Sequence, residues 1–166
     1  TAQNNLILKP AELIINDQDH EVFNADINEV AGKIKGDILY LDPPYNHRQY
    51  ATNYHMLETI AKYDNPEIHG KTGLREYQNQ KSLYCSRTQV KKSFKNLILK
   101  AKAKYIFLSY NNEGLMTLDD IKEIMSMRGK YGNFTKEYNR FKADKSENRN
   151  FTANKTTEYL HYVVCI

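Results

Sequence analysis

The sequence predicts an α/β fold with a mostly parallel sheet that is closed by an antiparallel hairpin. Short apolar strands alternate along the chain with stretches of helical periodicity. The run Ile38–Leu41 is continuously apolar, as in strands that are buried on both faces. The segment Glu158–Ile166 is rich in Tyr and Val, which favours a closing strand.

The first half of the chain shows a strand, helix, strand, helix order. We expect a strand at Glu21–Asn24, a helix that begins near Ile27, and the buried strand Ile38–Leu41. A stripe of Tyr50, Tyr54, Leu57 and Ala61 at helical spacing predicts a second helix, which ends before Asn65-Pro66. Residues 64–87 have no period and are expected to form a loop on the substrate side of the molecule.

The second half resumes the alternation. An apolar stripe predicts a helix over Val90–Ala101, followed by a buried strand at Tyr105–Leu108. Thr117, with Asp120 three residues later, predicts the start of a helix that stops by Gly129. Residues 133–140 and 158–165 are expected to pair as the closing hairpin.

Length and composition indicate one soluble domain. Its 166 residues are 40% hydrophobic and 27% charged, and can bury one sizeable core. Because no apolar run approaches the roughly 20 residues that cross a bilayer, we expect a cytoplasmic protein without membrane contact. Cys85 and Cys165 belong to no Cys/His cluster, so we expect reduced thiols and no metal.

The tetrapeptide Asp42-Pro43-Pro44-Tyr45 is the strongest indication of function. It follows the strand Ile38–Leu41, and ligands of open parallel sheets bind outside the carboxyl ends of the strands. The alternative is a proline-stiffened strand exit in which Asp42 caps a turn and Tyr45 packs on the surface. Only the functional interpretation gives each of the four residues a chemical role.

Those roles suit methylation of an exocyclic amino group. The lone pair of such a nitrogen is delocalised into the base, and the Asp42 carboxylate and the Pro43 carbonyl would localise it by accepting its N–H groups. The prolines, including Pro44, restrict the backbone, so that these acceptors need little reorganisation. Tyr45 would stack on a base that has been flipped out of the duplex.

These residues resemble the catalytic motif of the amino-group DNA methyltransferases, and Tyr40–Pro66 is similar to adenine modification methylases of type II restriction systems. Residues 109–114 resemble the loop beside the target-base pocket, and residues 154–160 the closing hairpin of that family. The resemblance implies a Rossmann-like fold, S-adenosylmethionine as cofactor, and double-stranded DNA as substrate. It also implies cofactor contacts from Ala25, Asp26 and Asp42, although Asp26 equally fits a helix N-cap.

One part of the family pattern is missing. The glycine-rich cofactor loop, Phe-x-Gly-x-Gly, should precede the tetrapeptide, and no such sequence occurs in this chain. The glycines at 70–73 and 129–132 lie in the wrong places and fit turns. We therefore expect residues 1–166 to be the carboxyl-terminal part of a single methyltransferase catalytic domain, with an upstream polypeptide segment as its partner.

Charge is concentrated near the end of the chain. Residues 128–157 hold eight basic residues and three acids, so the net charge of this segment is +5. The rest of the chain has a net charge of −1, which gives the total of +4. Tyr131, Phe134, Tyr138, Phe141 and Phe151 are interleaved with the cations, a mixture that suits phosphate contact and base stacking. The candidate DNA contacts are Arg140, Lys142 and Lys145, together with Arg48 beside the tetrapeptide. Alternatively the segment is a hairpin whose aromatic side chains pack inward while its lysines are solvated, and Arg48 pairs with a nearby acid.

Other functions share parts of this pattern. A truncated relative could bind DNA or a partner subunit without catalysis, and the missing glycine loop favours that alternative. Cytosine, RNA bases and protein glutamine also present amino groups. Asp42 argues against glutamine, since the related enzymes that modify it have Asn at that position, whereas the local chemistry leaves cytosine open.

Overall fold

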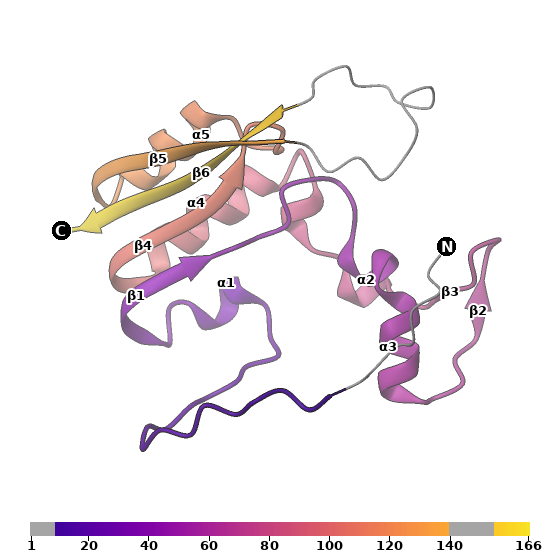
Figure 1. The fold of residues 1–166 in the computed structure, drawn as a ribbon. Helices are drawn as coiled ribbons and strands as arrows, with labels where there is room; N and C mark the ends of the chain where they lie inside the picture. Colours follow the sequence, from indigo (N-terminus) through magenta and orange to yellow (C-terminus); the bar gives the residue numbers. More distant parts are fainter. Residues whose placement is uncertain (1–8, 140–154) are drawn as a thin grey trace.

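The computed structural model describes residues 9–139 and 155–166, and its centre is a four-stranded sheet (Figure 1). The strands are β1 (Lys35–Leu41), β4 (Lys102–Asn111), β5 (Gly129–Asn139) and β6 (Lys155–Cys165), in the order β1-β4-β6-β5. Strands β1 and β4 are parallel, with Leu41 beside Leu108. Strand β6 is antiparallel to both β4 and β5. The α/β class and the closing hairpin are therefore confirmed.

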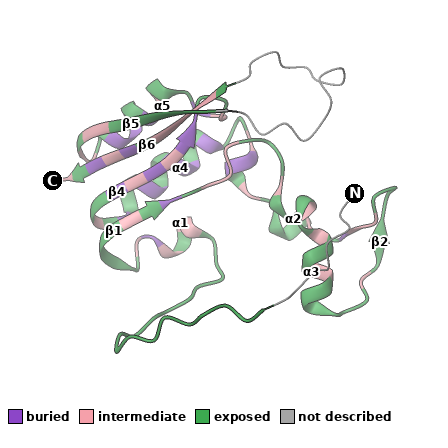
Figure 2. Ribbon diagram, viewed as in Figure 1, coloured by how far each residue is buried: buried purple, intermediate pink, exposed green. Residues whose placement is uncertain are grey.

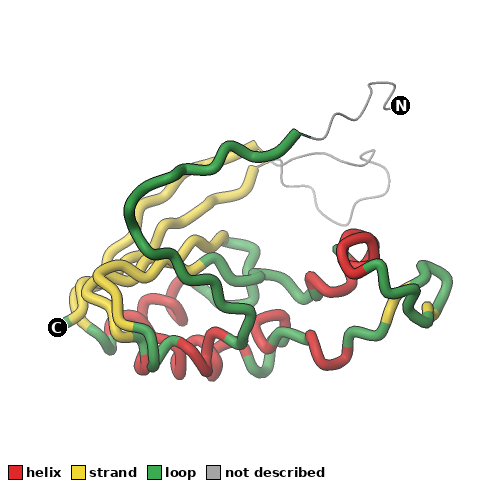
Figure 3. The backbone as a smooth tube through the Cα atoms, turned by 90° about the horizontal axis from the view of Figure 1, so that it is seen from below, coloured by secondary structure: helices red, strands yellow, loops and turns green. Residues whose placement is uncertain are grey.

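Three helices cover one face of this sheet (Figure 3): α1 (Ile27–Val30), α4 (Val90–Lys100) and α5 (Leu118–Ser126). The stripe predicted on α4 is buried, and it packs with alternate residues of β4 in the core. Helix α5 begins with the expected capping box, in which the Thr117 hydroxyl accepts from the Asp120 amide at 3.1 Å. The apolar sides of the helices and of the strands thus face one common core.

The connection between β1 and α4 projects away from the sheet. It contains α2 (Tyr50–Asn53), α3 (His55–Lys62), the two-residue strands β2 (Ile68–His69) and β3 (Leu74–Arg75), and the 3-10 turns η1 (Gln78–Gln80) and η2 (Leu83–Cys85). We call residues 46–87 the insertion. The single helix predicted from Tyr50 to Ala61 is broken at Tyr54, and the segment predicted as a loop is not free of regular structure. Figure 2 shows the insertion as largely exposed.

Helix α3 turns its apolar side outward. Leu57 is 62% exposed and Ile60 66%, so the stripe that predicted the helix is not its packed face. The packed side is polar: Arg75, which is buried, donates to the Thr59 hydroxyl at 3.3 Å and to the Asp64 carboxylate at 3.1 Å. The stripe thus predicted the helix correctly, but a hydrophobic stripe shows only that a helix is amphipathic and not that its apolar side is packed.

The strand expected at Glu21–Asn24 does not form. A strand needs a neighbour for its backbone N–H and C=O groups, and this exposed segment pairs with no strand in the described residues. The parallel share of the sheet is consequently smaller than predicted. Among the described strands, one of the three pairings in the sheet is parallel.

The second face of the sheet carries no helix among the described residues (Figure 3). It is nevertheless apolar. Its exposed large hydrophobic side chains include Ile38, Tyr40, Tyr105, Phe134, Leu160 and Val164. Phe107, Tyr162 and Phe134 form a row of rings across it, with centroids 6.4 and 5.5 Å apart. An apolar surface of this kind usually marks an interaction site.

Candidate active site

A cavity of about 880 Å³ lies where β1 ends. Asp42, Pro43 and Pro44 line it together with Ala25 and Asp26, which precede α1. The two acids that the sequence singled out, from segments 16 residues apart, therefore border the same space. Asn28, Tyr40, Tyr50, residues 79–84 of the insertion, and Phe94 and Leu97 of α4 contribute further walls.

The tetrapeptide is fixed at its far end. The backbone carbonyl of Tyr45 accepts from the Leu115 amide at 2.9 Å. The Tyr45 ring packs edge-on against Tyr110, with centroids 6.1 Å apart. Residues 109–114 thus lie beside the tetrapeptide, as the family resemblance implied, whereas Tyr45 is partly buried and does not line the cavity. Asp42 is exposed at the cavity wall and available to a ligand.

Asp26 combines two properties. One of its carboxylate oxygens accepts from the Asn28 backbone amide at 2.8 Å, so the N-cap interpretation is confirmed. Asp26 also lines the cavity. A carboxylate has room for several hydrogen bonds, and capping α1 leaves its other oxygen free for a ligand.

Sequence reasoning missed two tyrosines of the cavity wall. Burial raises the pKa of Tyr50, and the neighbouring charge of Asp42 raises it further. Burial also raises the pKa of Tyr84, with a contribution from the charge of Asp26. Both hydroxyls are therefore neutral hydrogen-bond donors near the two acids. Tyr50 was assigned only to a helical stripe, and Tyr84 lay in a segment without any period, so neither had a pattern that could reveal it.

The candidate DNA contacts are only partly visible. Arg140, Lys142 and Lys145 lie outside the described residues. The Arg48 guanidinium is exposed, and no ion pair of the described residues involves it. Of the neighbouring hairpin, Lys155 pairs with Glu137 at 2.9 Å, and Lys136 lies 5.0 Å above the Tyr138 ring.

Two members of the basic segment have structural roles instead. Arg128 donates to the carbonyls of Ile98 and Leu99 at the end of α4. Tyr131 turns toward the helices and bonds Nδ1 of the buried His161 at 2.8 Å. The solvated-hairpin alternative is thus right for the inward position of Tyr131 and wrong for Phe134 and Tyr138, which are exposed.

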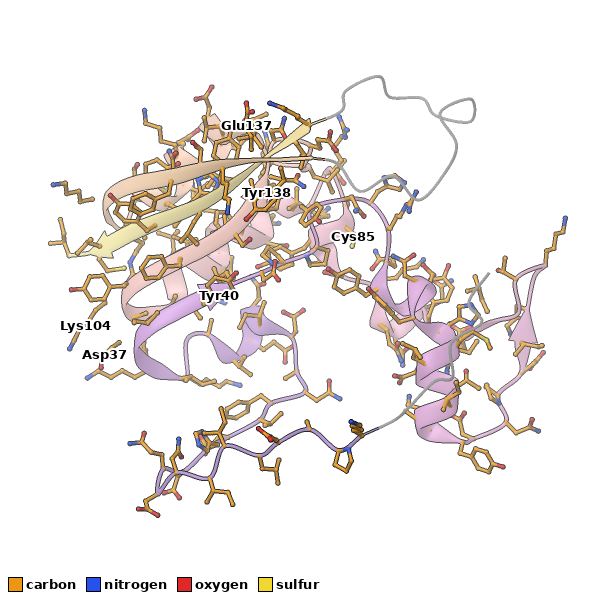
Figure 4. The ribbon with its side chains drawn as sticks, in the orientation of Figure 1. Asp37, Tyr40, Cys85, Lys104, Glu137 and Tyr138 are labelled. Atoms are coloured by element: carbon orange, nitrogen blue, oxygen red, sulfur yellow. The ribbon has the colours of Figure 1, made fainter. Side chains whose placement is uncertain are left out.

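The opposite end of the sheet provides a contrast. Asp37 and Lys104 face each other at the start of β1 and β4, 2.7 Å apart, whereas Cys85 lies near the exit of β1 (Figure 4). Cys85 and Cys165 are free thiols. Within the described ranges, no group of three or more His, Cys, Asp or Glu side chains is placed to hold a metal. No helix in those ranges is long and apolar enough to cross a membrane.

Comparisons with known proteins find type II methyltransferases that are similar to this chain. The type II methyltransferase M.NlaIII of Neisseria lactamica is 55% identical over 156 residues, which cover 94% of this chain and 46% of the relative. M.FokI of Planomicrobium okeanokoites is 41% identical over 165 residues, covering 98% and 25%. M.CviAII of Paramecium bursaria Chlorella virus 1 is 35% identical over 164 residues, covering 98% and 47%.

The chain thus spans less than half the length of each of these relatives. No solved structure matches it significantly. The model of the D12 class N6 adenine-specific DNA methyltransferases matches residues 1–127, a range that contains both Asp26 and Asp42. From the tetrapeptide, the cavity and this match, we conclude that the chain belongs to the D12 class N6 adenine-specific DNA methyltransferase family.

Proposed function

We propose that this chain supplies the catalytic part of a site-specific DNA adenine methyltransferase of a restriction-modification system, with S-adenosylmethionine as the methyl donor. The observation that carries the proposal is the cavity shared by Asp42-Pro43-Pro44 and Asp26. One acid, Asp42, lies at the carboxyl end of β1, and substrates of open α/β sheets bind outside the carboxyl ends of their strands. The other lies on the neighbouring cavity wall, where a second ligand fits beside the first.

The tetrapeptide prepares the adenine amino group. The Asp42 carboxylate and the Pro43 carbonyl accept the two N–H groups of a flipped adenine, which localises the nitrogen lone pair. The bound cofactor supplies a methyl group on a positively charged sulfur. The Asp42 and Pro43 acceptors would direct the nitrogen lone pair at that methyl group, the displaced sulfur would keep the electrons of its bond to carbon, and the proton released by the nitrogen would pass to solvent at the exposed Asp42 carboxylate. The Tyr45 ring, which packs edge-on against Tyr110, would offer the face on which the flipped base stacks.

We infer that the cavity receives the adenosine part of the cofactor. The Asp26 carboxylate would accept a hydrogen bond from a polar group of that ligand, and Ala25 would contact it beside Asp26. The chain contains no glycine-rich loop to hold the amino acid part. Its residues therefore account for one portion of the cofactor site, and the remainder has to come from another segment.

The proposed partner is a further polypeptide segment, upstream in the family arrangement, that carries this loop. The relatives are more than twice as long as the matched region. The uncovered sheet face and the outward face of α3 supply apolar surface for such a segment to cover. One segment would then complete the cofactor site and bury both surfaces.

The decisive variant is Asp42→Ala in an active methyltransferase that contains this chain. It should abolish methyl transfer and leave the cofactor dissociation constant nearly unchanged, because Asp42 acts on the substrate amino group. Tritium transfer to DNA and calorimetric cofactor titration measure the two effects. The matched control is Asp37→Ala, which removes an exposed carboxylate at the other end of β1 (Figure 4). Near-parental transfer by the Asp42 variant would refute the catalytic assignment.

The proposed DNA contacts have a separate test. Neutralising Arg140, Lys142 and Lys145 together should weaken DNA binding, and each lost phosphate contact should flatten the slope of log affinity against log salt by about one. Affinities at several salt concentrations measure that slope. An unchanged slope would mean that these three residues are solvated and do not contact DNA.

One observation favours a second candidate function. Because the chain lacks the glycine-rich loop, it fits a non-catalytic module that binds DNA or a partner subunit. Cofactor titration into an assembly of the chain with its partner segment separates the two candidates. Saturable binding with turnover supports the enzyme, and DNA binding without cofactor affinity supports the module.

A further inference from the structure

A short turn of the insertion, Ser82–Cys85, touches both ends of the cavity. Its backbone is closed locally, because the Ser82 hydroxyl accepts from the Tyr84 amide and the Ser82 carbonyl from the Cys85 amide, both at 3.2 Å. Tyr84 and Cys85 are buried, although the insertion around them is largely exposed (Figure 2). The turn is thus anchored in the core where the rest of the insertion is not.

At the Asp26 end, the turn acts through Tyr84. Its hydroxyl donates to the side-chain carbonyl of Asn28 at 2.9 Å. The Asn28 side-chain amide donates to the Ser93 carbonyl of α4 at 2.8 Å, and its backbone amide holds the Asp26 carboxylate at 2.8 Å. The Tyr84 hydroxyl therefore fixes the residue whose own backbone orients Asp26.

At the Asp42 end, the turn holds the chain that follows the tetrapeptide. The Gln49 side-chain amide donates to the Ser82 carbonyl at 3.2 Å and accepts from the Ser82 amide at 2.8 Å. The Cys85 thiol donates to the Arg48 carbonyl at 3.2 Å. Three hydrogen bonds thus fasten two residues just beyond Tyr45, while Leu115 fastens Tyr45 itself.

We propose that the Ser82–Cys85 turn is a strut that sets the position of the cofactor end of the cavity relative to its catalytic end. Tyr84 is the positioning residue for Asp26, and Gln49 is the positioning residue for the tetrapeptide. The proposal rests on the proposed function, since it assigns these two ends to cofactor and adenine. It predicts that the two residues affect different kinetic parameters, although Tyr84 belongs to the turn and Gln49 is bonded to it.

The first test is Tyr84→Phe in an active methyltransferase that contains this chain. The variant loses one hydroxyl, and the KM for S-adenosylmethionine should rise about tenfold with kcat within about twofold of parental, as expected when a buried hydrogen bond that orients a binding group is lost. The matched control is Tyr131→Phe, which removes another partly buried hydroxyl hydrogen bond, that to His161, on β5. The control should leave the KM unchanged.

The second test is Gln49→Leu, which replaces the side-chain amide with an apolar side chain and removes both bonds to Ser82. It should lower kcat about tenfold and leave the KM for the cofactor within about twofold, since misplacement of acceptor groups acts on the transition state. Gln89→Leu is the matched control, because the exposed Gln89 makes no side-chain hydrogen bond in capping α4.

A third measurement needs no activity. Hydrogen exchange of the Asn28 amide in the 166-residue chain should accelerate in Tyr84→Phe and not in Tyr131→Phe. An unchanged KM and exchange rate in Tyr84→Phe, or equal changes in kcat and KM in both variants, would overturn the strut. If Asp42→Ala retained full transfer, the proposed function itself would fail, so the two failures are distinguishable.

Discussion

The sheet layer and the insertion, two parts of one chain, are stabilised by different kinds of contact. In the sheet layer, apolar side chains of β1, β4 and β6 meet α4 and α5 in a continuous core. In the insertion, α3 meets the β2–β3 hairpin through Arg75, Thr59 and Asp64, and its apolar side faces solvent. On its helix-covered face the sheet layer therefore buries its apolar side chains within the described residues, whereas the apolar side of α3 is not covered by them.

The largest expected effect is on the core. Leu108 is fully buried in β4, so Leu108→Ala should lower the free energy of unfolding by about 2–5 kcal/mol, through lost transfer energy and a residual cavity. Urea unfolding of the 166-residue chain measures this loss. A loss below that range would mean that this core is looser than its burial indicates.

A smaller effect is expected from acid. His161 is buried, its Nε2 has no hydrogen-bond partner among the described groups, and burial lowers its pKa from 6.5 to about 4. Above pH 6.5 the residue is neutral in both the folded and unfolded states. Between pH 6.5 and 4 the unfolded chain takes up a proton that the folded chain does not, so stability falls as pH falls, by about 3 kcal/mol in all.

The change in unfolding free energy between pH 7.5 and pH 4 should therefore be larger for the parental chain than for His161→Phe. The variant lacks the titrating ring and should lose this part of the pH dependence. Carboxylates contribute equally to both proteins and cancel in the difference. Parallel curves over this range would contradict the assignment.

The smallest effect is expected on α3. Leu57→Ala makes the same substitution as Leu108→Ala at a side chain that is 62% exposed, and should change the free energy of unfolding by no more than about 0.5 kcal/mol. When the partner segment is added, the effect of Leu57→Ala on the unfolding free energy should become larger, because the outward face of α3 should then be covered. An equally small effect in that assembly would mean that the segment does not contact α3.

The sheet layer was predictable because its sequence patterns and its packing agree. The stripe of α4, the capping box before α5 and the apolar run of β1 each indicate an element whose apolar side is buried. The strand at Glu21–Asn24 was mispredicted, and the α3 stripe, which correctly indicated a helix, did not reveal that its apolar side is exposed. A strand needs a partner and an apolar stripe needs a cover, and a pattern in one segment shows neither.

The candidate site was half predictable. Asp42 was predicted from the chemistry of the tetrapeptide. Asp26 was predicted from the family resemblance and from its position before a helix. Tyr84, Gln49 and Asn28 could not be found, because their roles consist of hydrogen bonds across 33 and 56 residues of sequence. Such contacts leave no local period, and only the folded arrangement of the insertion against α1 reveals them.

The central claim is that this chain holds the catalytic side of the site and needs a further segment to complete the cofactor site. Calorimetric titration of S-adenosylmethionine into the 166-residue chain, followed by a DNA methylation assay with and without that segment, tests it most directly. The chain alone should bind the cofactor weakly or not at all and should not methylate DNA, and addition of the segment should restore both activities. Micromolar binding with turnover by the chain alone would contradict the claim and show that another local sequence replaces the glycine-rich loop.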